Sequence, residues 1–300
     1  MTSQPTAWQR LLRDQVAVIS ASILFAIILF AVLGPVVFNT HPHAVTDAQF
    51  QKPTSAHIFG TDLNGRDLFA RVLEGARISL IVGFSGAIIS LFVGTSYGLI
   101  AGYIGGRVDA MMMRLVEILY AIPRLIIIIL AVFILDPYLK QAIAPLFHGA
   151  LIGYTTIIIL ILCLGLIEWL TMARIVRGQV LALKEQQFVA AARSLGQSHY
   201  RIITRHLVPN LIGIVIVYLT LTIPSVILDE SFLSFLGLGI QPPQASWGSL
   251  LSDGAMEINP VKSYWWLLFF PAIIMSLTLL SLNFLGDSLR DVLDPRQKGK

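Results

Sequence analysis

Charged side chains are scarce in this sequence, and cysteine is almost absent. Only 13% of the 300 residues are charged, against roughly 25% in ordinary soluble domains. Cys163 is the single cysteine, which excludes an intramolecular disulfide and a thiol-rich metal site. Hydrophobic residues make up 56% of the chain, and the mean hydropathy is +0.77. These values exclude an ordinary soluble domain and predict a chain that crosses a membrane several times.

The sequence also lacks the common signatures of local chemistry. It has no G-x-x-x-x-G-K-[ST] loop for nucleotide phosphates, because its only Gly-Lys pair is Gly299 and Lys300. No H-E-x-x-H motif occurs, and His41 and His43 offer two ligands, too few for a zinc site. The stretch after Asp62 does not fit a calcium loop, since its glycine falls at the wrong position. We therefore expect no catalytic residue, no metal site and no cofactor held by this chain.

Long apolar runs are present instead. A helix needs about 20 apolar residues to cross a hydrocarbon core of about 30 Å. Five uncharged runs are long enough, and a sixth, which contains charges, is needed to return the chain across the membrane. The predicted spans are residues 16–38, 78–106, 111–135, 141–167, 207–228 and 263–286. The expected fold class is therefore an all-α polytopic membrane protein with six transmembrane helices.

Basic residues predict the orientation, because cytoplasmic segments carry an excess of Lys and Arg. With both termini in the cytoplasm, most of the 21 Lys and Arg residues lie inside. The positive net charge then needs no nucleic-acid partner. The expected organisation is a cytoplasmic N-terminus (1–15), a first span (16–38), an extracytoplasmic segment (39–77), a core of five spans (78–287) and a cytoplasmic tail (288–300). Within the core, residues 173–206 form a cytoplasmic loop and residues 229–262 an extracytoplasmic loop.

The most polar stretch between the spans, residues 185–210, predicts a short amphipathic helix for docking another protein. Apolar residues recur there at the i, i+3, i+4, i+7 spacing of one helical face. Small residues on that face would let a partner approach the backbone closely. The alternative is a helix that lies on lipid headgroups, which an alanine-rich face does poorly. The residues expected to couple this loop to a partner are Phe188, Ala191, Ala192, Arg193, Leu195 and Gly196.

This loop resembles that of the permease subunits of binding-protein-dependent ABC importers. Their signature is Glu-Ala-Ala, three residues and Gly, followed by a Leu-x-Pro-like element. Ala191, Ala192, Gly196 and the run from His206 to Pro209 match it, whereas Ala190 stands where the signature has Glu.

Further elements resemble the C-type permeases of oligopeptide and dipeptide importers within that family. The resemblance runs from about residue 57 to 296. Its elements are GTDLNGRD (60–67), MMMRLVEIL (111–119), MARIVRGQ (172–179), SFLGLG with PP and SWG (234–248) and NFLGDSLRDVLDPR (283–296).

The resemblance implies a type I ABC importer permease fold in the bacterial cytoplasmic (inner) membrane. It implies a heterodimer with a B-type permease, two ABC ATPase subunits that bind ATP and Mg, and an extracytoplasmic peptide-binding protein. The cargo implied is an oligopeptide or dipeptide, with nickel chelates, glutathione or peptide-like antibiotics as alternatives. From the residues alone, a secondary transporter or channel and a non-transporting membrane scaffold also stay open.

Charged residues inside apolar spans are costly and therefore candidates for function. Asp229 and Glu230, at the predicted outer end of the fifth span, could contact a substrate ammonium or form a gate, or they could simply be solvated at the interface. Arg124 is expected to reach the headgroups, and Glu168 to mark a membrane boundary.

Glycines at every fourth position of the second span predict close helix packing. They are Gly94, Gly98, Gly102 and Gly106.

Overall fold

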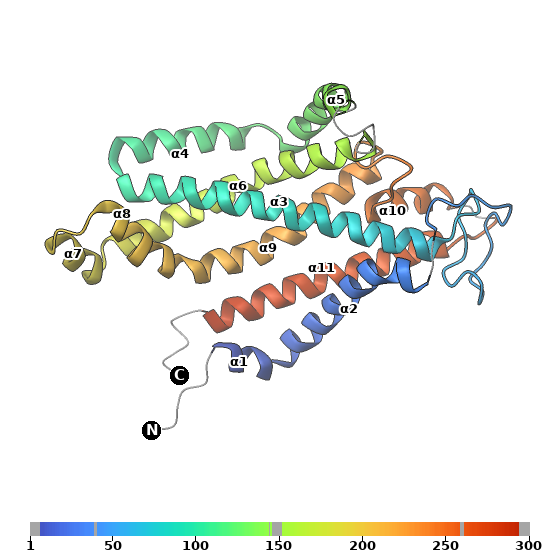
Figure 1. The fold of residues 1–300 in the computed structure, drawn as a ribbon, viewed down its shortest axis with the longest axis horizontal. Helices are drawn as coiled ribbons and strands as arrows, with labels where there is room; N and C mark the ends of the chain where they lie inside the picture. The colour runs from blue at the N-terminus through green and yellow to red at the C-terminus, as the bar shows by residue number, and fades with distance from the viewer. Residues whose placement is uncertain (1–6, 39–40, 144, 146–151, 259–260, 294–300) are drawn as a thin grey trace.

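Most of the long helices, among them α3, α6, α9 and α11, run along the length of the molecule, whereas α5 is seen nearly end-on (Figure 1). The computed structural model describes residues 7–38, 41–143, 145, 152–258 and 261–293. Within these residues six helices are long and apolar enough to span a membrane, which confirms the predicted fold class. They are α2 (Gln15–Val37), α3 (Leu68–Ile104), α5 (Arg124–Ile143), α6 (Thr155–Lys184), α9 (Val208–Phe235) and α11 (Trp266–Leu293).

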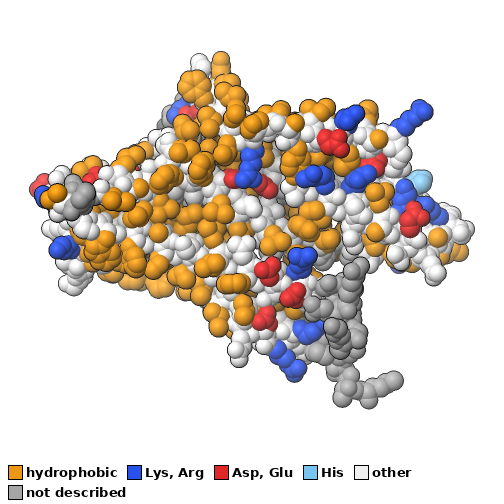
Figure 2. All heavy atoms as spheres, turned by 180° about the vertical axis from the view of Figure 1, so that it is seen from behind, with side chains coloured by type: hydrophobic (Ala, Val, Ile, Leu, Met, Phe, Trp, Pro, Cys, Tyr) orange, Lys and Arg blue, Asp and Glu red, His pale blue; other side chains and the backbone are white. Residues whose placement is uncertain are grey.

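Shorter elements lie at the two ends of this bundle and beside it. The loop helices α7 and α8 lie at one end, and residues 41–67 lie with α10 at the other (Figure 1). Figure 2 shows hydrophobic side chains over most of the long flank between these ends. The shorter elements are α1 (Ala7–Arg13), α4 (Gly106–Ala121), η1 (Ile152–Tyr154), α7 (Gln187–Ser194), α8 (His199–Ile202), η2 (Ile203–Leu207) and α10 (Trp247–Met256).

The predicted third span, residues 111–135, is wrong. The chain is helical in α4, breaks at Ile122 and Pro123, and starts again as α5 at Arg124. Ile122 has the extended backbone (φ −87°, ψ 129°) that a following proline imposes. The charged residues Arg114 and Glu117 therefore lie in α4, where they form an exposed pair at 3.7 Å, and not in a span.

The predicted fourth span, residues 141–167, begins too early, although residues 155–167 do lie in a helix long and apolar enough to span a membrane. Residues 141–143 end α5, and the next long helix is α6, which starts only at Thr155 and continues to Lys184. Residues 144 and 146–151 of the prediction lie outside the described chain. The prediction divided the two spans at Asp136 and Lys140, but both residues lie within α5, where they pair with each other. The prediction also began α3 ten residues late. That helix starts at Leu68, where Asp67 caps it by accepting a bond from Ala70 N at its Oδ1 (2.9 Å).

The glycine ridge of α3 packs against α6, as predicted. A Cβ atom on Gly94 would lie 2.7 Å from the carbonyl oxygen of Trp169, and one on Gly102 would lie 2.9 Å from that of Arg177. A Cβ on Gly98 would collide with the Ala173 carbonyl oxygen. The ridge ends there, because nothing lies within 4 Å of a Cβ on Gly106. The glycines thus bring two spanning helices into backbone contact.

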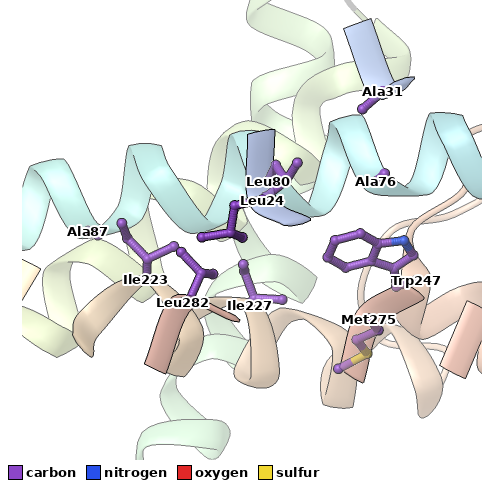
Figure 3. Packing of buried hydrophobic residues seen from close by; sticks show 10 residues of the cluster. All are labelled: Leu24, Ala31, Ala76, Leu80, Ala87, Ile223, Ile227, Trp247, Met275 and Leu282. Carbon is purple, nitrogen blue, oxygen red and sulfur yellow. The ribbon is translucent and has the colours of Figure 1, made fainter. Parts of the chain in front are cut away.

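The first span is held to α3 by a polar contact as well as by packing. Pro35 in α2 has no N–H, so the carbonyl of Ala31, four residues earlier, loses its helical donor. Arg77 of α3 supplies one, with its Nη2 3.1 Å from that oxygen. Around this contact lies an apolar core to which α2, α3, α9, α10 and α11 contribute, with the Trp247 ring fully buried (Figure 3).

The outer segment, residues 41–67, is anchored by a buried arginine. Arg71 is 2% exposed, and its Nη1 lies 2.8 Å from Asp62 and 3.1 Å from Asp253. Asp62 also accepts from Arg66 Nε at 2.7 Å. Gly65 makes the turn between them with φ +68°, a conformation that favours glycine. Residues of the GTDLNGRD element thereby fix the outer segment to α3 and α10.

Candidate functional site

The candidate coupling loop leaves the bundle where α6 ends. Helix α7 follows after two residues and stops at Gly196, whose φ of +70° closes a Schellman motif. In that motif Gly196 N donates to Arg193 O at 2.9 Å, and Gln197 N donates to Ala192 O at 3.1 Å. A Cβ on Gly196 would touch nothing within 4 Å. Glycine is therefore required here by the backbone conformation, irrespective of any close approach by a partner.

The predicted coupling residues divide between two sides of α7. Phe188 and Leu195 are 40% and 79% exposed, and Ala191 lies between them on the same outward flank. Arg193 and Gly196 are exposed as well. Ala192 is 3% exposed and points into the protein, so it was wrongly placed on the outward face. Tyr200 of α8 is also 77% exposed, and it was not singled out from the sequence.

The buried side of the loop ties it to two spans. Val189 and Ala192 pack in one apolar cluster with Val176 and Val180 of α6 and Leu211 of α9. Val189 is fully buried, yet sequence reasoning missed it, although its i, i+3 relation to Ala192 could have marked an inner face. Helix α7 is therefore packed against α6 and α8, within an apolar cluster that extends to α9.

The chain re-enters the bundle through a short π-helix, residues Ile203–Leu207. Pro209 follows directly and cannot donate a backbone hydrogen bond, which disturbs the regular α-helical ladder. The extra residue per turn places His206 so that its Nε2 lies 3.1 Å from Oε1 of Gln197. The Leu-x-Pro-like element of the sequence is thus the joint between the loop and α9.

The two acidic residues predicted for a substrate path have different surroundings. Glu230 is fully buried and faces serine hydroxyls. Ser79 Oγ donates to its Oε2 at 3.0 Å, and Ser234 Oγ donates to its Oε1 at 2.7 Å. Ser79 Oγ also accepts from Trp247 N at 3.2 Å, which includes α10 in the same network. Glu230 therefore joins α3, α9 and α10 from within and has no open face for a substrate.

Asp229 has different surroundings and pairs with one charged side chain, Arg124, which also pairs with Glu168. Arg124, at the start of α5, places Nη2 3.0 Å from Asp229 Oδ1 and Nη1 3.3 Å from Glu168 Oε1. Arg124 thus pairs with acids in α6 and α9, and its reach to the headgroups stays a prediction. Glu168 lies near the middle of the 30-residue α6 with its side chain 13% exposed, so it does not mark a boundary.

The Arg124 contact belongs to a polar stripe along α6. Thr171 bonds with Tyr120 of α4, and the Arg174 guanidinium lies 4.0 Å from the centre of that tyrosine ring. Arg177 forms a two-point ion pair with Asp109, with Nη2 2.6 Å from Oδ2. The stripe recurs at every third residue of one helix. It links the α4–α5 break to the part of α6 that continues into the coupling loop.

Comparison with known proteins places the whole chain among importer permeases. The family described as "Binding-protein-dependent transport system inner membrane component" matches residues 94–299. That described as "N-terminal TM domain of oligopeptide transport permease C" matches residues 6–53. Together the two matches include most of the sequence.

Individual relatives cover nearly the full chain. It is 44% identical to the dipeptide transport system permease protein DppC of Bacillus subtilis, over 97% of this chain and 85% of that protein. It is 47% identical to the oligopeptide transport system permease protein OppC of Escherichia coli, over 97% and 91%. Among solved structures, an inward-facing MetNI methionine ABC transporter matches with a TM-score of 0.55 and 16% identity, covering 76% of this chain and 98% of that one, which shows the shared fold.

Proposed function

The chain belongs to the family of binding-protein-dependent transport system inner membrane components, and from this membership we propose that it carries oligopeptides or dipeptides across a bacterial inner membrane. The observation that carries the proposal is the 44% to 47% identity with peptide permeases over 97% of the chain. The partners proposed are a B-type permease, two ABC ATPases that hold ATP and Mg, and an extracytoplasmic peptide-binding protein. The chain itself supplies the path and the coupling loop.

The coupling step follows from the two sides of α7. Phe188, Ala191 and Leu195 on the outward flank form the surface proposed to seat in an ATPase, with Arg193 and Gly196 beside it. Ala192 acts from beneath, as part of the apolar cluster that joins α7 to α6 and α9. When the ATPase pair closes, the loop moves with it, and the two spans move in turn. The energy of ATP hydrolysis thereby reaches the path without ATP binding to this chain.

Uptake measurements test the proposal. Cells that carry the complete system are compared with and without this chain for uptake of labelled di-, tri- and pentapeptides. We expect loss of peptide uptake without the chain, and dependence of uptake on the ATPase subunits. Uptake that persists without the ATPases would instead indicate a secondary transporter. If deletion changes no peptide's uptake, the peptide assignment fails, and nickel chelates and glutathione become the next cargoes to measure.

A substitution on the outward flank tests the docking surface. Ala191→Trp adds bulk where the ATPase is proposed to seat, so we expect normal membrane insertion, loss of co-purified ATPase and loss of uptake. Ala182→Trp is the matched control, because Ala182 is exposed on α6 outside the loop helix. Full ATPase recovery and normal uptake with Ala191→Trp would contradict the docking proposal.

A further inference from the structure

The ion pairs that Arg124 forms beside the α4–α5 break join one basic side chain to two acidic ones. Glu168 and Asp229 bring two carboxylates together, and their side chains are only 13% and 10% exposed. Arg124 is the only basic side chain, among the residues that the structure describes, that forms an ion pair with either of them. One guanidinium facing two acids within spanning helices leaves an excess negative charge, an arrangement that is costly in an apolar medium.

The same arginine has an open side. Its side chain is 54% exposed, although it lies at the start of a helix long and apolar enough to span the membrane. It lines a hollow of about 280 Å³ formed where Pro123 interrupts the chain, together with Tyr120, Ile127 and Leu170. A guanidinium exposed to hydrocarbon would be strongly unfavourable, so this side requires water or a polar occupant. Arg124 thus lines the hollow and also pairs with the two acids, Glu168 and Asp229.

We propose that Glu168 and Asp229 form a transient binding site for the free α-ammonium group of a peptide in passage. This inference rests on the proposed peptide-import function. In the structure Arg124 pairs with both carboxylates; an arriving ammonium offers three N–H donors and a second positive charge for the two acids. The guanidinium is then displaced toward the hollow, where its exposed side already lies. The ligand class is therefore a primary amine cation, which an acetylated N-terminus cannot replace.

The position of the site suits such a step. Its three residues come from α5, α6 and α9, and the last two contribute to the apolar cluster in which the buried side of α7 packs. A relative shift of α6 and α9 would separate the two carboxylates and weaken their joint hold on an ammonium. The loop motion and the release of the ligand are thus linked through the same helices.

Uptake kinetics of charge-neutral variants test the site. In the complete transporter, Glu168→Gln and Asp229→Asn are each expected to lower the maximal rate of tripeptide uptake about tenfold, the scale of one lost bond to a charged group. The control is Glu117→Gln, an exposed acid on α4, which should leave the rate unchanged. The combined variant Arg124→Gln, Glu168→Gln, Asp229→Asn distinguishes an ammonium-binding site from three residues that only form ion pairs with one another. A purely structural triad would regain transport once all its charges are removed, whereas the binding site would stay defective.

A photoreactive tripeptide, labelled next to its N-terminus, supplies a second readout in purified membrane complexes. We expect cross-linking to the wild-type chain, about tenfold less to the Glu168→Gln and Asp229→Asn variants, and equally little from the N-acetylated probe. Equal cross-linking by both probes, or normal uptake by the single variants, would overturn the ammonium site while leaving the import function intact. Absence of peptide uptake by the wild-type system would instead overturn the proposed function.

Discussion

The two ends of the molecule differ in how their residues are held. The outer segment is held by ion pairs within this chain, because the buried Arg71 contacts both Asp62 and Asp253. The cytoplasmic loop is fixed only on its underside, while Phe188 and Leu195 project outward. The difference indicates that the outer end holds its shape by itself. The loop, by contrast, is packed against the bundle on one side and exposes apolar side chains on the other, where we propose that an ATPase docks.

Removing the buried arginine should break the outer end most severely. Arg71→Ala leaves Asp62, itself 5% exposed, without its deepest counter-charge, and we expect a loss of about 3–5 kcal/mol of stability. Thermal unfolding of the purified complex in detergent measures it. Arg66→Ala is the milder control, since the Arg66 side chain is 14% exposed. Equal effects of the two substitutions would contradict the anchoring role of Arg71.

A substitution in the contact between α3 and α6 should have an intermediate effect on stability. Gly98→Ala places a methyl group against the Ala173 carbonyl oxygen and forces α3 and α6 apart, at a cost of about 1–3 kcal/mol. Gly178→Ala is the matched control, because a Cβ there meets nothing within 4 Å and alanine favours the helix. The same unfolding measurement distinguishes them, and a stable Gly98→Ala variant would show that the ridge tolerates separation.

The smallest effect is expected in the loop. Gly196→Ala meets no steric obstacle, but it forces an alanine to adopt φ +70°, at a cost of about 1 kcal/mol. We expect global thermal stability to change little, while proteolysis within residues 185–206 becomes faster, because the strain is confined to the end of α7. Gly178→Ala again serves as the control. A large fall in global stability would show that the loop is as deeply integrated as the outer segment.

The sequence predicts that six spans exist, but it places their ends poorly where charged residues lie inside the helices. The glycine ridge of α3 was predictable because its spacing has one simple use in lipid. The α5–α6 boundary was not, since Asp136 and Lys140, which separate the two predicted spans, both lie within α5. In the loop, the helical period identified the amphipathic helix, but which face is buried depends on α6 and α9, so Ala192 was misplaced. Asp229 and Glu230 are adjacent in the sequence, yet Asp229 pairs with Arg124 while Glu230 accepts bonds from serine hydroxyls. Residue type alone does not predict that difference.

The serine hydroxyls that donate to Glu230 restrict the order in which the helices assemble during synthesis. Synthesis proceeds from the N-terminus, so Ser79 of α3 is already in the membrane when α9 emerges from the ribosome. Ser234 follows four residues behind Glu230, and the backbone of Trp247, which bonds to Ser79, comes later still. An acid entering the bilayer must find its donors quickly, so α3 has to be kept beside the insertion site until α9 arrives. The close contact between non-consecutive helices is therefore also a requirement of biogenesis, and it orders their assembly in time.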